Sequence, residues 1–192
     1  MVDEPETNLT EPLWLPHRRV PRSRVPVGLL SWLLDASSLT RRVQGACTGR
    51  FEVRVLHEGW QRPTLNERRA LGVRRGVRAL VREVYLVCAG EPWVFARTVI
   101  PVSTLSGRRR RLRDLGSRPL GAFLFADRSM TRGGVELACI GQRERLYARA
   151  TRSLSSPPTA IWGRRSVFRL GGRPLLVSEI FLRVGNRSYA GS

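Results

Sequence analysis

Two arginines, Arg82 and Arg97, stand where an alternating strand pattern otherwise places apolar side chains. Arg82 lies in the run 80–88 and Arg97 in the run 93–100, and each shares its strand face with aliphatic or aromatic residues. Such a charge is informative because arginine is rarely buried without a partner. The planar guanidinium donates two parallel hydrogen bonds to a carboxylate. The pattern therefore predicts a pocket for a small carboxylate.

The relative position of the two arginines depends on how the two runs pair. A four-residue hairpin loop, 89–92, sets Cys88 opposite Trp93 and brings both arginines to one face, roughly 7 Å apart at Cβ. A register shifted by one residue places them on opposite faces. Neighbouring glutamates could also neutralise both groups, or each arginine could extend past the rim of the sheet. The shared pocket is therefore a hypothesis about register.

Glu179 is a carboxylate in a similar position in the run 175–183, where it alternates with apolar residues. A buried carboxyl there could donate or accept a hydrogen bond to a substrate hydroxyl. With Gly171-Gly172 as a two-residue turn, Arg164 lies opposite Glu179. A salt bridge across the hairpin is thus an alternative, and it does not exclude a site.

Two expected helix starts offer backbone amides. Leu39 follows Ser38, and Leu120 follows Pro119. Amides in a first helical turn have no partner within the helix and bind anions readily. Every helix has such amides, so this observation adds to the arginine pattern without standing alone.

No other catalytic motif competes with these residues. The sequence contains no GxSxG, HExxH or Walker motif, and no GxGxxG before a helix. We therefore predict no cofactor and no metal. Its three cysteines, Cys47, Cys88 and Cys139, are far apart and odd in number. We predict no disulfide, Cys88 as a small core residue, and a reducing cytoplasmic location.

The formal net charge is +19, and all 34 basic residues are arginine. A complete absence of lysine indicates a bias across the whole chain rather than selection for phosphate binding. We expect no specific nucleic-acid partner, although the charge attracts a small dianion. No apolar run reaches eighteen residues, which predicts no membrane insertion.

The elements that must position these residues read as an α+β domain. We expect a helix near 26–34, a short helix ending near Val43, an arginine-rich helix ending near Gly116 and a helix from Pro119. The arginine-rich segment 59–78 reads as a loop, and the segment 141–160 reads as polar, with a loop from Ser153 to Pro158. Strands are expected at 50–57, 80–88, 93–100, 134–140, 163–170 and 175–183. The prediction is one antiparallel sheet of about six strands, with helices covering one face.

Several strings closely resemble the chorismate pyruvate-lyase family, in order and spacing, from about residue 27 to 183. They are Glu91-Pro92-Trp93, the run from Arg97 to Gly107, Pro119-Leu120-Gly121, Ile161 to Ser166, and Pro174-Leu175-Leu176. The resemblance implies cofactor-free cleavage of chorismate to 4-hydroxybenzoate and pyruvate, in the supply of ubiquinone precursors. We also expect a monomer. It places the substrate-binding positions on Leu39, Arg82, Leu120 and Glu179, with Arg82, Arg97 and Glu179 as the catalytic set.

Domain boundaries follow from the extent of the resemblance, and the sequence also differs from the family's pattern in places. We expect a flexible arm over 1–24, the lyase domain over 25–185 and a tail over 186–192. Leu39 stands where the family often has methionine, and 141–160 is longer than expected. One alternative function is a non-catalytic carboxylate-sensing effector domain of the same fold. The other is a basic nucleic-acid-binding protein.

Overall fold

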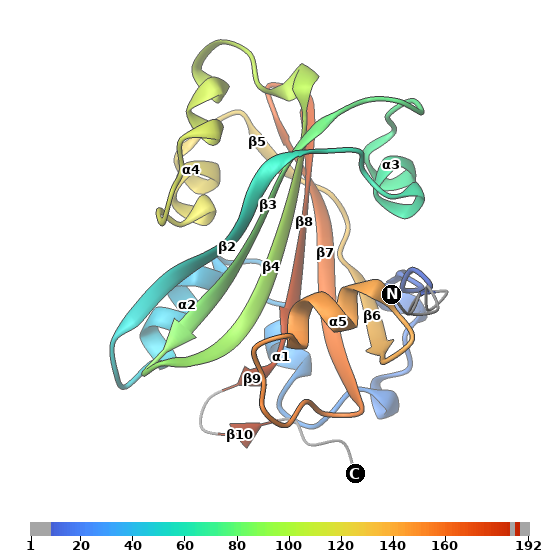
Figure 1. Ribbon diagram of the computed structural model, residues 1–192, viewed down its shortest axis with the longest axis vertical. Helices are drawn as coiled ribbons and strands as arrows, with labels where there is room; N and C mark the ends of the chain where they lie inside the picture. Colours follow the sequence, from blue (N-terminus) through green and yellow to red (C-terminus); the bar gives the residue numbers. More distant parts are fainter. Residues whose placement is uncertain (1–8, 185–186, 189–192) are drawn as a thin grey trace, which may run out of the picture.

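An eight-stranded antiparallel sheet forms the centre of the computed structural model, which describes residues 9–184 and 187–188 (Figure 1). The strand order is β1-β6-β7-β8-β4-β3-β2, and β5 pairs with β7. The longer strands are β2 (Phe51–Gln61), β3 (Ala79–Cys88), β4 (Glu91–Pro101), β6 (Glu136–Gly141), β7 (Ala160–Leu170) and β8 (Arg173–Phe181). The short ones are β1 (Leu15–Pro16) and β5 (Met130–Arg132), and β9 (Arg183–Val184) pairs separately with β10 (Arg187–Ser188). The predicted α+β fold is confirmed.

Short helices lie on both faces of this sheet rather than on one. The α-helices are α1 (Leu30–Leu33), α2 (Leu39–Ala46), α3 (Leu65–Leu71), α4 (Leu120–Ala126) and α5 (Arg145–Thr151). The 3-10 helices are η1 (His17–Arg19), η2 (Arg22–Arg24), η3 (Val102–Thr104) and η4 (Gly107–Arg113). All ten residues of β3 are buried, so both faces of the central strands need cover.

We call the two faces the pocket face and the rear face. The pocket face carries Arg82, Val84 and Leu86 of β3, and α1, α2 and α4 pack there. The rear face carries Glu83 and Tyr85 of β3, and α3 and α5 pack there. Two separate apolar layers therefore form, one on each side of the sheet.

The β3–β4 hairpin has a tighter turn than predicted. Ala89 and Gly90 form it with φ values of 50° and 85°, the left-handed conformation of a two-residue hairpin turn. A register shift follows between Leu86 and Val87. Arg82 consequently pairs with Thr98, and Glu83 pairs with Arg97. The prediction that Arg82 and Arg97 share a face is wrong, because this register places them on opposite faces.

Two helices occupy segments in which no helix was predicted. Thr64 and Glu67 form a capping box at the start of α3, within the predicted loop 59–78. In the predicted polar stretch 141–160, α5 buries Tyr147 and Ala150. Both helices are only seven residues long and bury few apolar side chains. Their periodicity was therefore too weak to predict a helix.

Part of the predicted N-terminal arm packs against the domain. Trp14 is buried, β1 pairs with β6, and the Glu11 carboxylate accepts a hydrogen bond from the Asn66 backbone amide at 2.8 Å. Residues 9–24 therefore contribute to the packing. The remainder of the arm, and most of the predicted tail 186–192, lie outside the described residues.

A disulfide joins Cys47 to Cys88, with the two Cα atoms 5.7 Å apart. The prediction that no disulfide forms is therefore wrong. The two cysteines are 41 residues apart in sequence, but the end of α2 returns to the end of β3. Cys139 is free and exposed.

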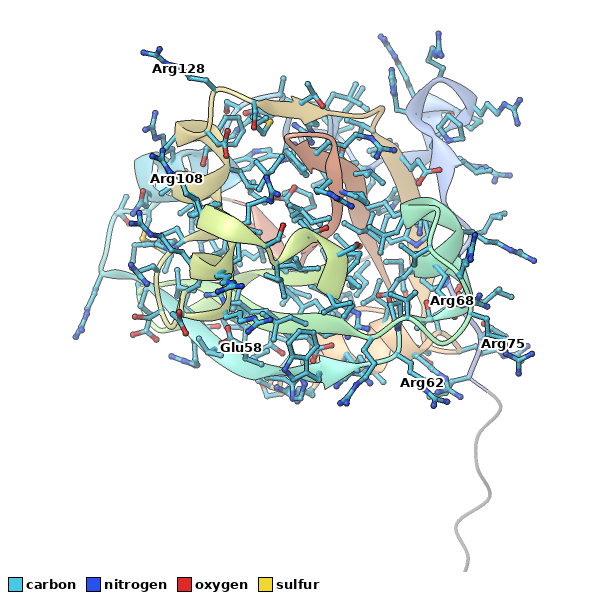
Figure 2. All side chains as sticks on the ribbon, turned by 90° about the horizontal axis from the view of Figure 1, so that it is seen from above. Glu58, Arg62, Arg68, Arg75, Arg108 and Arg128 are labelled. Atoms are coloured by element: carbon cyan, nitrogen blue, oxygen red, sulfur yellow. A yellow bond between two sulfur atoms is a disulfide. The ribbon has the colours of Figure 1, made fainter. Side chains whose placement is uncertain are left out.

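Many arginines point into solvent, as Arg62, Arg75, Arg108 and Arg128 do in Figure 2. Across the described ranges, no helix is long and apolar enough to span a membrane.

Candidate active site

A pocket lies on the pocket face, between the sheet and the starts of α2 and α4. Strands β2, β3, β4, β7 and β8 provide its floor, and α2, α4 and β5 provide its walls. Most of its lining is aliphatic or aromatic, as in pockets for small organic ligands. Its charged and hydroxyl-bearing residues are Ser37, Ser38, Thr40, Arg82, Thr98, Arg132, Arg164 and Glu179.

Arg82 reaches this pocket from β3 and is only 2% exposed. Its Nη2 donates hydrogen bonds to the carbonyls of Gly116, at 2.6 Å, and Arg118, at 3.2 Å. Its Nε forms an ion pair with Glu58 Oε2 at 3.2 Å but, within the described part of the chain, is buried without a hydrogen-bond partner. Burial lowers the pKa of Arg82, and Glu58 offsets this only in part. Since arginine stays charged, Arg82 is a desolvated cation that an anion would stabilise.

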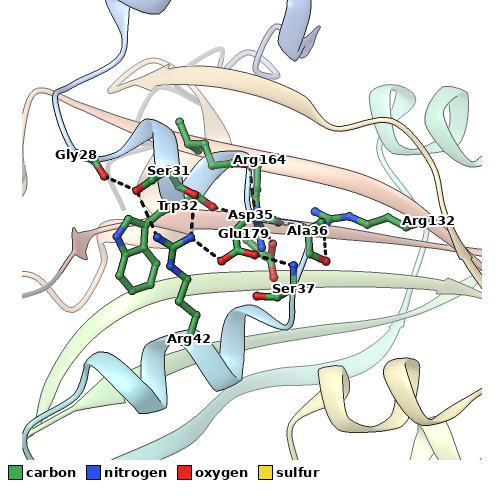
Figure 3. A network of polar contacts seen from close by, with 11 residues as sticks. Gly28, Ser31, Trp32, Asp35, Ala36, Ser37, Arg42, Arg132, Arg164 and Glu179 are labelled. Carbon is green, nitrogen blue, oxygen red and sulfur yellow. Dashed lines mark hydrogen bonds and ion pairs between the residues drawn. The ribbon is translucent and has the colours of Figure 1, made fainter.

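Glu179 lies in the same pocket, on β8. It faces Arg164 of β7 across the hairpin, and Arg164 Nε donates to Glu179 Oε2 at 2.6 Å (Figure 3). Arg164 also donates to the carbonyls of Trp32, at 2.9 Å, and Asp35, at 2.6 Å. The predicted cross-hairpin salt bridge is therefore present. It holds the Glu179 carboxylate in place and leaves it part of the pocket lining.

The loop 35–38 that leads into α2 is tied down by Asp35. Asp35 Oδ1 accepts from the Ser37 backbone amide at 2.6 Å, and Asp35 Oδ2 accepts from Arg42 at 2.5 Å (Figure 3). Although burial acts to raise it, the pKa of Asp35 is lowered overall by these bonds from Ser37 and Arg42. The ion pair therefore orients the pocket wall formed by this loop.

Arg97 lies on the rear face, outside this pocket. Its Nε and Nη2 donate to Glu67 at 2.6 and 3.1 Å, and its Nη1 donates to Glu83 at 2.7 Å. Although burial acts to lower it, these two carboxylates raise the pKa of Arg97 overall. Both partners are buried as well. Arg97 is therefore a compensated cation, in contrast to Arg82.

Four of the five predicted site residues line one pocket: Leu39, Arg82, Leu120 and Glu179. Arg97 does not line it, so the predicted arginine pair is not formed. Arg132 and Arg164 also line the pocket and were not predicted as site residues. Arg164 alternates with Trp162 and Phe168, so the rule that found Arg82 would have found it. Arg132 lies in a three-residue strand beside glycines, where sequence gives no such signal.

Known proteins resemble this chain over most of its length. A sequence model of the family described as "Chorismate lyase" matches residues 9–189. This chain belongs to the chorismate lyase family. A probable chorismate pyruvate-lyase from Aromatoleum aromaticum is 46% identical over 171 residues, covering 88% of this chain and 91% of that protein. One from Azoarcus sp. is 49% identical and covers 80% and 83%, and a chorismate pyruvate-lyase from Erwinia tasmaniensis is 37% identical and covers 88% and 84%.

Solved structures extend the fold beyond the chorismate lyase family. The C-terminal domain of a histidine utilization repressor from Pseudomonas syringae pv. tomato has a TM-score of 0.55 at 13% identity, covering 74% of this chain and 98% of that domain. The ligand-binding domain of a putative GntR-family regulator from Bordetella bronchiseptica has a TM-score of 0.52 at 18% identity, covering 75% and 90%. At these identities the likeness concerns the fold alone.

Proposed function

We propose that this chorismate lyase family member cleaves chorismate to 4-hydroxybenzoate and pyruvate without a cofactor. The observation that carries the proposal is the pairing, in one largely apolar pocket, of an incompletely partnered buried cation with a positioned carboxylate. Arg82 is the cation and Glu179 is the carboxylate. A small cyclic acid that also bears a hydroxyl matches this pair of groups.

In this proposal the substrate lies flat over the floor of the pocket. Arg82 binds the ring carboxylate, and Glu179 meets the 4-hydroxyl. Leu39 and Leu120 form apolar walls, and the backbone amide of Leu39, in the first turn of α2, supports the bound anion. Burial strengthens each of these polar contacts because little water competes for them.

The reaction needs no nucleophile from the protein. The bond between ring carbon 3 and the ether oxygen breaks, and that oxygen becomes the ketone oxygen of pyruvate. The hydrogen of ring carbon 4 passes to the enolpyruvyl methylene, which becomes the methyl group of pyruvate. The ring becomes aromatic and keeps its 4-hydroxyl. The protein contributes by holding a compact conformer of the substrate and by stabilising charge on the departing oxygen.

The decisive experiment mixes the purified protein with chorismate, without added metal or nucleotide. We expect pyruvate and 4-hydroxybenzoate to appear in equal amounts. Once the protein has been removed from the mixture, lactate dehydrogenase with NADH measures the pyruvate, and ultraviolet absorbance measures the 4-hydroxybenzoate. Binding of chorismate without pyruvate release would contradict the lyase proposal and favour a carboxylate-sensing effector domain.

Several narrower proposals accompany the activity. We propose a monomer that acts in the cytoplasm, supplies the ubiquinone precursor, and has neither a specific nucleic-acid partner nor a membrane-inserted part. We also propose product inhibition, since an aromatic acid held by buried charges dissociates slowly. Progress curves unaffected by added 4-hydroxybenzoate would contradict this last point.

A further inference from the structure

Arg132 enters the same pocket from the side opposite Arg82. It lies on β5, which pairs with β7 so that Arg132 faces Phe168. Its Nε donates to Ser166 Oγ at 3.1 Å. Its Nη1 donates to the carbonyls of Asp35, at 3.2 Å, and Ala36, at 3.3 Å (Figure 3). The guanidinium also lies over the Phe168 ring. Contacts from β7 and the loop 35–38 therefore fix the position of this cation.

The charge of Arg132 is not neutralised by these contacts. Each oxygen that accepts its hydrogen bonds is neutral, and within residues 9–184 Arg132 forms no ion pair. The nearby carboxylates of Asp35 and Glu179 already pair with Arg42 and Arg164. Burial and the neighbouring charge of Arg164 lower the pKa of Arg132, and the carboxylates of Glu179 and Asp35 offset this only in part. Arg132 is thus a second incompletely compensated cation in the pocket.

Sheet register places the two cations at opposite ends of one row. Arg82 pairs with Thr98, Thr98 with Val177, and Val177 with Ser166, which holds Arg132. Three strand spacings of about 4.8 Å separate Arg82 from Ser166, or roughly 14 Å between backbones. Both arginines line the pocket between these two ends, so a small dicarboxylate bound there has a cation at each end. A monoacid could engage only one end.

We propose that Arg132 binds the enolpyruvyl carboxylate of chorismate while Arg82 binds the ring carboxylate. This inference rests on the proposed lyase function and assigns the second carboxylate a partner. The ether and the 4-hydroxyl are on adjacent ring carbons, so the enolpyruvyl group lies at the Glu179 end of the pocket. Arg132 is at that end, because its Nη1 and the Nη1 of Arg164 donate to the same Asp35 carbonyl, and Arg164 pairs with Glu179.

The assignment makes substrate and product respond differently to a change at Arg132. Chorismate carries both carboxylates, whereas 4-hydroxybenzoate retains only the one assigned to Arg82. Arg132→Gln should therefore lower kcat/KM for chorismate by about 30-fold or more, since a charge-assisted hydrogen bond is lost. The inhibition constant for 4-hydroxybenzoate should change less than about threefold. Arg82→Met should weaken both.

Two further variants separate binding from net charge and from folding. Arg128→Gln removes the same charge from an exposed position beside β5 and should leave both constants unchanged. Arg132→Lys keeps a cation without the planar fork, so it should show a smaller loss confined to chorismate. If Arg132→Gln does not fold, Arg132→Lys is the variant that tests the role of Arg132.

Equal weakening of chorismate and 4-hydroxybenzoate by Arg132→Lys would overturn the inference, as would unchanged chorismate kinetics in Arg132→Gln. If the wild-type protein binds chorismate without turnover, the lyase proposal fails by itself. The same variants then test Arg132 by calorimetry, through the ratio of the two dissociation constants. Wild-type protein that binds neither compound would overturn both proposals.

Discussion

Individual residues differ here in how fully their charge is compensated, and this difference is the reason for proposing that Arg82 binds the substrate and that Arg97 stabilises the fold. Arg97 contacts two carboxylates, whereas Arg82 contacts one, and among the described residues its buried Nε has no hydrogen-bond partner. Both are arginines on apolar strand faces, so sequence alone treats them alike. Their partners decide that one stabilises the fold and the other is available to a substrate.

Arg82→Met should remove the ring-carboxylate anchor. We expect kcat/KM for chorismate to fall by about 100-fold or more, because a desolvated, charge-assisted contact is lost. Steady-state kinetics with a pyruvate readout measures this. A variant that folds normally and retains wild-type kcat/KM would contradict the assignment of Arg82.

Arg97→Met should destabilise the protein by about 3–5 kcal/mol, since it leaves two buried carboxylates without their cation. Urea denaturation measures this loss in the free energy of unfolding. The double variant Arg97→Met with Glu67→Gln should recover part of it. The activity per folded molecule of Arg97→Met should fall less than that of Arg82→Met. If Arg97→Met instead loses activity while its free energy of unfolding is unchanged, Arg97 takes part in the reaction.

At the scale of elements, the disulfide links the end of α2 to the end of β3. Helix α2 begins at the pocket wall, and β3 carries Arg82, so the bond connects two elements of the site. Disulfides are uncommon in a reducing cytoplasm. The redox state of this pair in cells therefore bears directly on the proposed location.

Reduction of this disulfide should lower the free energy of unfolding by about 2–4 kcal/mol, because it frees a long loop in the unfolded chain. Urea midpoints with and without dithiothreitol measure the effect, and Cys47→Ser should be unaffected by the reductant. Cys139→Ser is the matched control, since Cys139 is free. If the urea midpoint of the wild-type protein is the same with and without dithiothreitol, the disulfide is absent in solution.

At the scale of the whole molecule, a net charge of +19 surrounds a pocket that we propose for a dianion. The field of such a surface raises the encounter rate with anions. It also gives weak, nonspecific attraction to any polyanion, which salt screens.

Added sodium chloride should therefore lower kcat/KM for chorismate. Between about 20 mM and 500 mM salt we expect a loss of several-fold, mostly through KM, since screening weakens attraction more than chemistry. Initial rates at matched viscosity measure this. A flat salt dependence would show that the surface charge has no part in substrate capture.

The sequence by itself determined the antiparallel α+β class and most of the pocket. Alternation with a period of two, together with the family strings, was enough to select Arg82 and Glu179, because each signal lies within one strand. Leu39 and Leu120 followed from local helix starts and from the resemblance. The short, arginine-rich helices α3 and α5 were not predicted, because they bury too few apolar side chains to give a helical pattern of hydrophobic residues.

Only the tertiary structure decided which charges meet. A two-residue turn and a shift between Leu86 and Val87 moved Arg97 to the rear face, and no local pattern predicts such a shift. Arg132 reaches the pocket through pairing of β5 with β7, and Cys47 reaches Cys88 across 41 residues. These contacts depend on register and on chain return over long separations, which propensity and periodicity do not encode.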